Sequence, residues 1–144
     1  VVIIGEGEAK NELIELSRTL NVIDRTLFLD YLPTPYNYLS LFDVYAMCSR
    51  SEGFGLAAVE ATLMQTPVVC SNISIFKEIF DDTKVSFFEL DNISSLLESI
   101  NIAISTIGKL KAKVALNYSL NNFSGYKMAS NYLDIYSNLL NGKI

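Results

Sequence analysis

The 144-residue sequence contains no histidine, so it lacks the side chain that most often serves as a general base and as a zinc ligand. Cysteine is almost as scarce, with Cys48 and Cys70 each standing at the end of a predicted strand. These two could form a disulfide or bind a metal, but free thiols in a reducing compartment are the better interpretation. We therefore expect a cytoplasmic protein that works without histidine chemistry.

Long apolar runs are also missing, and no segment approaches the length of a membrane span. The chain has no basic-then-apolar leader, and it opens directly on the apolar residues 1–4, which are typical of a core strand. From this abrupt start we expect the chain to be part of a larger protein.

Charge is sparse and mostly negative, with 19% charged residues and a net charge of −5. An acidic balance argues against a nucleic-acid-binding surface. Residues 1–72 contain nine acidic and four basic residues, whereas residues 73–144 contain seven of each. A phosphate bound by the first half would therefore depend on backbone amides more than on basic side chains.

Half of the residues are hydrophobic, and short apolar runs typical of buried strands alternate with segments of helical periodicity. The expected strands are residues 1–4, 26–29, 44–47, 67–70 and 85–89. The expected helices are residues 9–20, 36–42, 55–64, 74–80, 93–104 and 125–140, with a basic helix between the last two that Gly108 separates from residues 93–104. Asp91 or Asn92 could cap the helix of residues 93–104, and Ser124 could cap the last helix. This alternation predicts an α/β fold with a doubly wound, Rossmann-like parallel sheet, and residues 1–144 are expected to form one domain.

The most informative stretch is residues 48–60, where a predicted strand ends, a loop with Gly53 and Gly55 follows, and an apolar helix begins. A glycine-containing turn at a helix start directs backbone N–H groups and the positive end of the helix dipole at a ligand, which suits a phosphate. Glu52 and Glu60 add two side chains that accept hydrogen bonds. Together these features indicate a ligand that is both phosphorylated and rich in hydroxyl groups, such as a nucleotide sugar.

The carboxylates and the arginine of this stretch also have simpler interpretations. Glu60 projects from an otherwise apolar helix face, so it either meets a ligand or reaches water or an arginine at the edge of that face. Glu52 is either a ligand contact or a solvated loop acid. Arg50 could meet a phosphate, or it could pair with Glu52.

Other patterns leave alternatives open in the same way. Gly5 and Gly7 follow the first strand, but Lys10 stands where a dinucleotide-binding pattern needs its third glycine, so they form either a tight turn or a backbone contact to a ligand. The lysines of the basic helix are typical of a solvated face: Lys109, Lys111 and Lys113. The apolar stripe of the last helix, about residues 124–141, is either core or a docking face for an absent N-terminal domain.

The segment of residues 51–60 reads Ser-Glu-Gly-Phe-Gly-Leu-Ala-Ala-Val-Glu, and Thr-Pro-Val-Val follows at residues 66–69. It resembles the C-terminal domain of the family 4 retaining glycosyltransferases, which have the GT-B fold. Those enzymes carry two glutamates separated by seven residues, with Glu-Gly-Phe-Gly at the first. Residues 1–7, 28–32 and 122–136 resemble further segments of that domain, so the likeness extends over nearly the whole chain.

By that resemblance, the chain would be the donor-binding half of an enzyme that transfers a hexosyl group from a UDP- or GDP-sugar to a glycan or lipid-linked acceptor. Glu52 would be the catalytic residue, accepting hydrogen bonds from the donor sugar, and Glu60 would bind the ribose. The other donor-binding positions would be Gly53, Phe54, Gly55 and Leu56 at the diphosphate, Tyr31 and Leu32 at the base, and Gly5 with Gly7 at the donor sugar or acceptor. No metal or other cofactor is expected, because protein donors would stabilise the leaving diphosphate.

The resemblance also has gaps. Asp30 stands where the family usually has glycine and adds an acid beside the base-binding loop, and Cys48 replaces a common proline. The basic residues that clamp the diphosphate, and the domain that holds the acceptor, would lie before Val1. We therefore expect the chain alone to bind donor weakly and to transfer no sugar, and the full-length protein could work at the inner face of the membrane. A GT-B-like epimerase or phosphorylase, and a non-catalytic nucleotide- or protein-binding module with a decayed site, remain alternatives.

Overall fold

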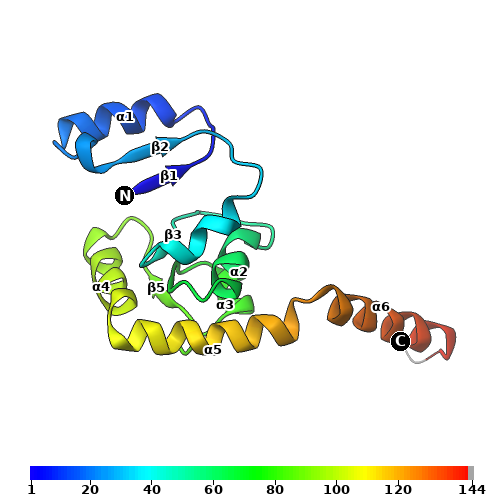
Figure 1. Ribbon diagram of the computed structural model, residues 1–144. Coiled ribbons are helices and arrows are strands. Elements are labelled where there is room, and N and C mark those ends of the chain that lie inside the picture. Colours follow the sequence, from blue (N-terminus) through cyan, green and yellow to red (C-terminus); the bar gives the residue numbers. More distant parts are fainter. Residues whose placement is uncertain (143–144) are drawn as a thin grey trace. The chain divides into compact units, whose positions relative to one another are not determined.

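The structure is a computed structural model that describes residues 1–142. The chain divides into two compact units, Val1–Asn37 and Tyr38–Ile144. Figure 1 shows the order of the helices and strands along the chain. Within the described residues, none of the helices combines the length and the apolar character needed to cross a membrane.

The first unit is a strand-helix-strand arrangement. Strands β1 (Val2–Ile4) and β2 (Leu27–Leu29) pair in parallel. Helix α1 (Lys10–Thr19) and the short 3-10 helix η1 (Ile23–Arg25) lie between them in sequence. Parallel neighbours need such a crossover, because a tight hairpin turn joins only antiparallel strands. The two strands and the helix predicted for this region are confirmed.

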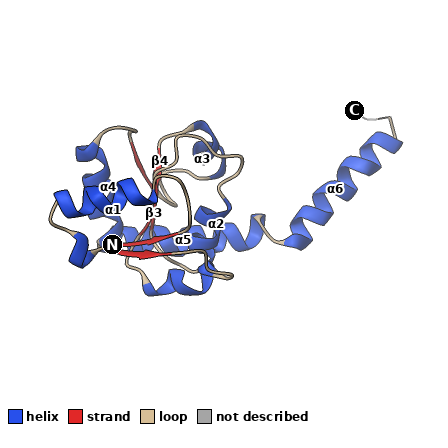
Figure 2. Cartoon of the chain, turned by 90° about the horizontal axis from the view of Figure 1, so that it is seen from above, coloured by secondary structure: helices blue, strands red, loops and turns tan. Residues whose placement is uncertain are grey.

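The second unit contains a three-stranded parallel sheet in the order β3-β4-β5. Its strands are β3 (Tyr45–Met47), β4 (Val68–Ser71) and β5 (Ser86–Phe88). Its helices are α2 (Leu56–Leu63), α3 (Ser74–Ile79), α4 (Ile93–Ile104), α5 (Thr106–Asn122) and α6 (Gly125–Leu140), and the 3-10 helix η2 (Pro35–Leu41) crosses the division between the units. All strand pairs of both sheets are parallel, as the alternating sequence predicts. Figure 2 shows the strands in red and the helices in blue.

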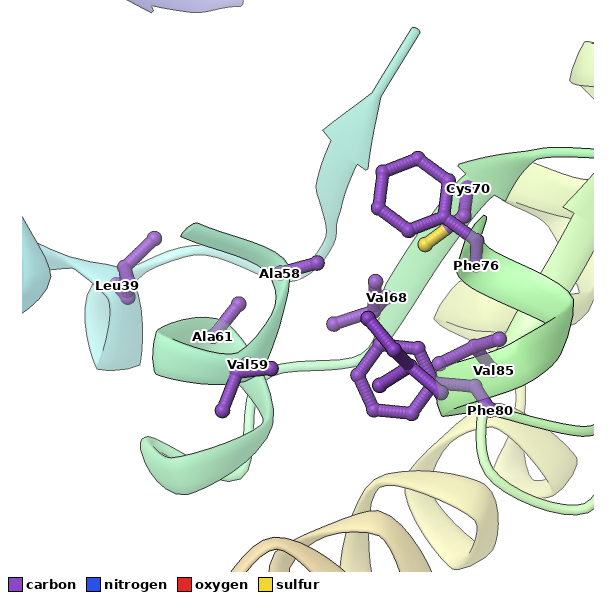
Figure 3. Packing of buried hydrophobic residues seen from close by; sticks show 10 residues of the cluster. Leu39, Ala58, Val59, Ala61, Val68, Cys70, Phe76, Phe80 and Val85 are labelled. Atoms are coloured by element: carbon purple, nitrogen blue, oxygen red, sulfur yellow. The ribbon is translucent and has the colours of Figure 1, made fainter. Parts of the chain in front are cut away.

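The middle strand, β4, explains why helices cover both faces of this sheet. All four of its residues are buried, and successive side chains of a strand point to opposite faces. Val68 and Cys70 pack with residues of α2 and α3, as Figure 3 shows. Val69 packs instead with Phe88 of β5 and Ala103 of α4. The predicted doubly wound arrangement is therefore confirmed.

The expectation that Gly108 separates two helices is wrong. Ser105 alone separates α4 from α5, and its hydroxyl caps α5 by accepting a hydrogen bond from the backbone N–H of Ile107 at 3.1 Å. Gly108 lies inside the first turn of α5, where an added Cβ would be 1.9 Å from the carbonyl oxygen of Ala103. The glycine therefore permits close contact between α5 and the end of α4.

The expectation of three solvated lysines on α5 is wrong at its middle position. The ammonium of Lys111 donates to the carbonyl oxygen of Val85 at 3.0 Å and lies 3.3 Å from the hydroxyl oxygen of Ser86. Lys109 and Lys113 are exposed, as expected. Lys111 therefore connects α5 to the start of β5.

Candidate functional site

The loop between β3 and α2, residues 48–55, ends at a position that suits only glycine. Gly55 precedes α2 and has a φ of 84°, in the left-handed region that side chains disfavour. An added Cβ would also lie 2.4 Å from Cε1 of Phe76. Gly55 thus lets the chain enter α2 directly against α3. Within the described residues no side chain caps the start of α2, so the first N–H groups of this helix point toward the loop without a side-chain acceptor.

Two carboxylates flank this helix start, Glu52 in the loop and Glu60 on α2. Both side chains are half-buried. Within residues 1–142, neither carboxylate forms a hydrogen bond or an ion pair, although other acidic residues of the chain do. Asn72 Oδ1 is the one buried side-chain oxygen or nitrogen without a partner within the described residues, so the carboxylate oxygens of both glutamates are accessible to water or to a ligand. Neither the pairing of Glu60 with an arginine nor that of Glu52 with Arg50 is found.

Tyr45, the first residue of β3, is close enough to both carboxylates for their charges to act on it. The sequence pattern does not single it out as a site residue. Burial, together with smaller contributions from the charges of Cys70, Glu52, Glu60 and Cys48, raises its pKa to about 12. Its hydroxyl lies 3.6 Å from the sulfur of Met47. Both glutamates therefore act on one half-buried hydroxyl. Only its place in the strand that leads into the loop could have indicated this from the sequence.

The residues between the two carboxylates present backbone more than side-chain polar groups. Gly53 has open space around it, and Leu56 is exposed at the start of α2. Phe54 packs its ring edge-on against Phe123, with the ring centroids 5.7 Å apart. This contact fixes one side of the loop in the second unit while leaving the N–H groups of the α2 start available to an anion.

Arg50 makes an interaction that neither sequence interpretation included. Its guanidinium donates two hydrogen bonds to the carboxylate of Asp91, at 2.9 and 2.6 Å. Asp91 stands in the turn between β5 and α4, with a φ of 60°. The hydrogen bonds from Arg50 and its charge lower the pKa of Asp91 below its usual value.

In the first unit, the glycine loop after β1 lies beside the end of β2. Gly5 has a φ of 135° and donates its N–H to the carbonyl oxygen of Leu29 at 3.0 Å. Gly7 has no atoms near the position that a Cβ would occupy. The acid Asp30, which follows β2, is paired with Lys10 of α1, so the negative charge next to the expected base-binding residues has a cationic partner.

The candidate residues fall into two groups, one in each unit. Glu52, Glu60 and the backbone positions Gly53, Phe54, Gly55 and Leu56 belong to the second unit, at the carboxyl end of β3. Gly5, Gly7, Tyr31 and Leu32 belong to the first unit, at the carboxyl ends of β1 and β2. Open α/β sheets bind ligands at this edge. Both groups thus follow the carboxyl ends of parallel strands, and the roles of the individual residues stay predictions.

In the part of the chain that the structure describes, the thiols and acids show no arrangement suited to a metal. Among residues 1–142, no three cysteine, aspartate or glutamate side chains are grouped so that they could hold a metal ion. Cys48 and Cys70 are both free, the first exposed and the second buried. Burial and, to a smaller extent, the charge of Cys48 raise the pKa of Cys70 to about 12, so this thiol stays protonated and unreactive at neutral pH.

A family model described as "Glycosyl transferases group 1" matches residues 1–117, which is most of the chain. The chain belongs to this glycosyltransferase family. It is 37% identical over 138 residues to the O-antigen biosynthesis glycosyltransferase WclY of Escherichia coli, a match that includes 96% of this chain and 38% of WclY. A second relative, from Campylobacter jejuni, is named N-acetylgalactosamine-N,N'-diacetylbacillosaminyl-diphospho-undecaprenol 4-alpha-N-acetylgalactosaminyltransferase. It is 32% identical over 102 residues, which include 69% of this chain and 28% of that protein.

The solved structures support the same fold for this glycosyltransferase domain. The Anabaena protein Alr3699/HepE, in its complex with UDP, superposes with a TM-score of 0.87 over 95% of this chain and 40% of that one, at 20% identity. At this identity the likeness establishes the fold, a Rossmann-like domain of the GT-B type. The chain spans well under half the length of the relatives that it matches, with 38% in the case of WclY.

Proposed function

We propose that this chain is the donor-binding half of a retaining glycosyltransferase that transfers a hexosyl group from a nucleotide-diphosphate sugar. The observation that carries the proposal is the pair of half-buried carboxylates, Glu52 and Glu60, which have no partner within the described residues and flank an uncapped helix start. A sugar nucleotide carries a diphosphate for the helix start and hydroxyl groups for both carboxylates. It would therefore satisfy all three features at once.

The diphosphate would be bound at the start of α2 through backbone N–H groups of residues 53–56. This part of the chain is acidic, with nine acids against four bases in residues 1–72, so backbone donors and the helix dipole must supply the attraction. Negative charge grows on the diphosphate as its bond to the sugar breaks. Donors that are already oriented stabilise that charge without reorganising. Basic groups from the remainder of the full-length protein would add to them, and no metal is required.

Glu60 and Glu52 would accept hydrogen bonds from different parts of the donor. Glu60 lies one turn into α2, so its carboxylate would bind the ribose hydroxyls next to the diphosphate. Glu52 lies in the loop before the helix and would bind hydroxyl groups of the transferred sugar. In the first unit, Tyr31 and Leu32 would contact the base, and Gly5 with Gly7 would allow the donor sugar or acceptor to approach the backbone.

The relatives supply the class of product that we propose. WclY is named as an O-antigen biosynthesis enzyme, and the Campylobacter relative is named for a diphospho-undecaprenol acceptor. We accordingly propose a role in polysaccharide or glycolipid synthesis, with a glycan or lipid-linked acceptor bound by the rest of the full-length protein. Because HepE was solved with UDP, UDP-sugars are the first donors to test.

Helix α6 would dock on that remaining part of the protein. None of its residues is buried, and its large apolar side chains are exposed at Tyr126, Met128, Tyr132, Leu133, Ile135, Tyr136, Leu139 and Leu140. Such a surface is costly in water. Changing Tyr132 and Tyr136 together to serine should lower the melting temperature of the full-length protein while leaving the chain of residues 1–144 unaffected. An equal fall in the melting temperature of the full-length protein and of the chain of residues 1–144 would contradict the docking proposal.

The proposed function is tested by calorimetric titration of the full-length protein with UDP and with UDP-sugars. Glu60→Gln should weaken both kinds of ligand about tenfold or more, because it removes a charged hydrogen-bond acceptor from the ribose. Glu52→Gln should weaken the UDP-sugar and leave UDP unaffected. Glu98→Gln, which changes an exposed acid of α4, is the matched control. Unchanged affinities in both site variants, or no nucleotide-sugar binding by the wild type, would refute the proposal and favour a non-catalytic module.

A further inference from the structure

We propose that Arg50 and Asp91 are positioning residues whose ion pair holds the loop that carries Glu52. The inference rests on the proposed function, because Glu52 is given its role there. It concerns the state of the loop before any ligand binds. Neither residue is placed in contact with the donor.

The ion pair is bidentate, so it fixes the relative orientation of the two side chains as well as the distance between them. Nη1 of Arg50 donates to Oδ2 of Asp91 at 2.9 Å, and Nη2 donates to Oδ1 at 2.6 Å. Two parallel charged hydrogen bonds restrict the guanidinium plane far more than a single contact does. The two residues are 41 positions apart in the sequence. Arg50 follows β3 and Asp91 follows β5, and in the sheet order β3-β4-β5 these are the two outer strands. The ion pair therefore joins the loop after β3 to the turn after β5, across the carboxyl end of the middle strand, β4.

Asp91 is a firm anchor because its turn is closed by several hydrogen bonds. The N–H of Asn92 donates to the carbonyl oxygen of Glu89 at 3.2 Å. The side chain of Asn92 accepts from the N–H of Ser95 at 3.0 Å, and the hydroxyl of Ser95 accepts from the N–H of Glu89 at 3.0 Å. These bonds join the turn to the first turn of α4. The carboxylate of Asp91 thus projects from a fixed piece of backbone.

The loop itself has few other attachments. At its beginning, the buried hydroxyl of Ser71 donates to the carbonyl oxygen of Ser49 at 2.6 Å. At its end, Gly55 lies against Phe76, and the ring of Phe54 packs edge-on against Phe123. Between these points, the Arg50–Asp91 pair accounts for the side-chain hydrogen bonds that residues 50–54 make within the described part of the chain. Arg50 is two residues before Glu52, so releasing it would lengthen the free part of the loop around the glutamate.

Because the ion pair is exposed, a role in positioning the loop can be distinguished by experiment from a role in stabilising the fold. The side chains of Arg50 and Asp91 are 72% and 69% exposed. Exposed ion pairs contribute little to the stability of a fold. Loss of this pair should therefore change the mobility of the loop without a comparable change in the melting temperature. A purely structural contact in the core would change both.

The test measures amide hydrogen exchange by mass spectrometry in the full-length protein without nucleotide. Arg50→Gln and Asp91→Asn should each raise exchange of the 48–55 segment by about twofold to fivefold, as expected for the loss of an exposed pair. Asparagine tolerates the left-handed backbone at position 91, so the second variant keeps the turn. The double variant should exchange no faster than either single one, because both changes remove the same interaction. Arg18→Gln, which breaks an exposed pair with Glu15 on α1, is the control and should leave the segment unchanged.

Donor affinity provides the second readout and separates the two proposals. Both single variants should weaken UDP-sugar binding by a similar factor of about two to five. Unchanged exchange in both variants would overturn the inference. So would a loss of affinity in Arg50→Gln alone, since that result would mean that Arg50 contacts the ligand directly. If the wild type binds no nucleotide sugar, the proposed function fails, and the exchange data without ligand still decide whether the pair holds the loop.

Discussion

Replacing Gly55 with alanine should destabilise the second unit by about 2–5 kcal/mol. One part of this cost is conformational, because the φ of 84° at Gly55 lies in a region that costs a residue with a Cβ about 1–2 kcal/mol. The other part is steric, because the new Cβ would lie 2.4 Å from Cε1 of Phe76. Phe76 is 0% exposed and packed in the core, so it can move aside only by disturbing its neighbours, at about 1–3 kcal/mol.

Urea unfolding followed by circular dichroism measures this effect, and Gly53→Ala is the matched control in the same loop. Gly53 has no atoms within 4 Å of the position that a Cβ would occupy, so that variant should retain the wild-type midpoint. The midpoint of Gly55→Ala should fall by roughly 1 M or more for a domain of this size. Equal midpoints for the two variants would refute the account of how the loop enters α2.

Two further changes test the packing of α5 against α4 and the half-buried hydroxyl of Tyr45. Gly108→Ala should lower the urea midpoint by an amount equivalent to about 1–3 kcal/mol, since its Cβ would meet the carbonyl oxygen of Ala103 at 1.9 Å. Gly125→Ala, in open space at the start of α6, should leave the urea midpoint unchanged or raise it. A fall of the midpoint in both variants would contradict the proposed contact between Gly108 and Ala103. Tyr45 keeps its proton in the folded protein up to a pKa of about 12, whereas its ordinary pKa is 10.0. Stability should therefore be independent of this group below pH 10 and fall by up to about 2–3 kcal/mol as the pH rises from 10 to 12. In Tyr45→Phe this part of the fall should be absent from urea midpoints measured across that range, and an identical pH profile would contradict the burial of the hydroxyl.

The sequence predicted the fold and the elements that carry the candidate site. Alternating strand and helix patterns were sufficient because the underlying preferences are local, depending on neighbours within a few positions along the chain. The last helix extends from Gly125 to Leu140 with Ser124 as its cap, as expected. Of the two caps considered for α4, Asn92 is the one that accepts the hydrogen bond. The spacing of Glu52 and Glu60 around a glycine turn likewise needed no tertiary information.

Interactions between distant segments could not be obtained in this way. Gly108 resembles a helix break by residue type, yet the close approach of α4 makes glycine necessary inside α5. Lys111 resembles its exposed neighbours Lys109 and Lys113, and only the position of β5 beside it provides a buried acceptor. Sequence periodicity describes which face a residue occupies, but it does not say which backbone group that face meets.

The sequence by itself determined the class of fold, the carboxyl-edge position of the candidate residues, and the family to which the chain belongs. Only the tertiary structure decided the partner of Arg50, which lies 41 residues away, and the half-buried hydroxyl of Tyr45 on which both glutamates act. The physical reason is that ion pairs and pKa shifts depend on distances through space. Those distances are set by the order of strands in the sheet, after each strand and helix has formed from its own local pattern.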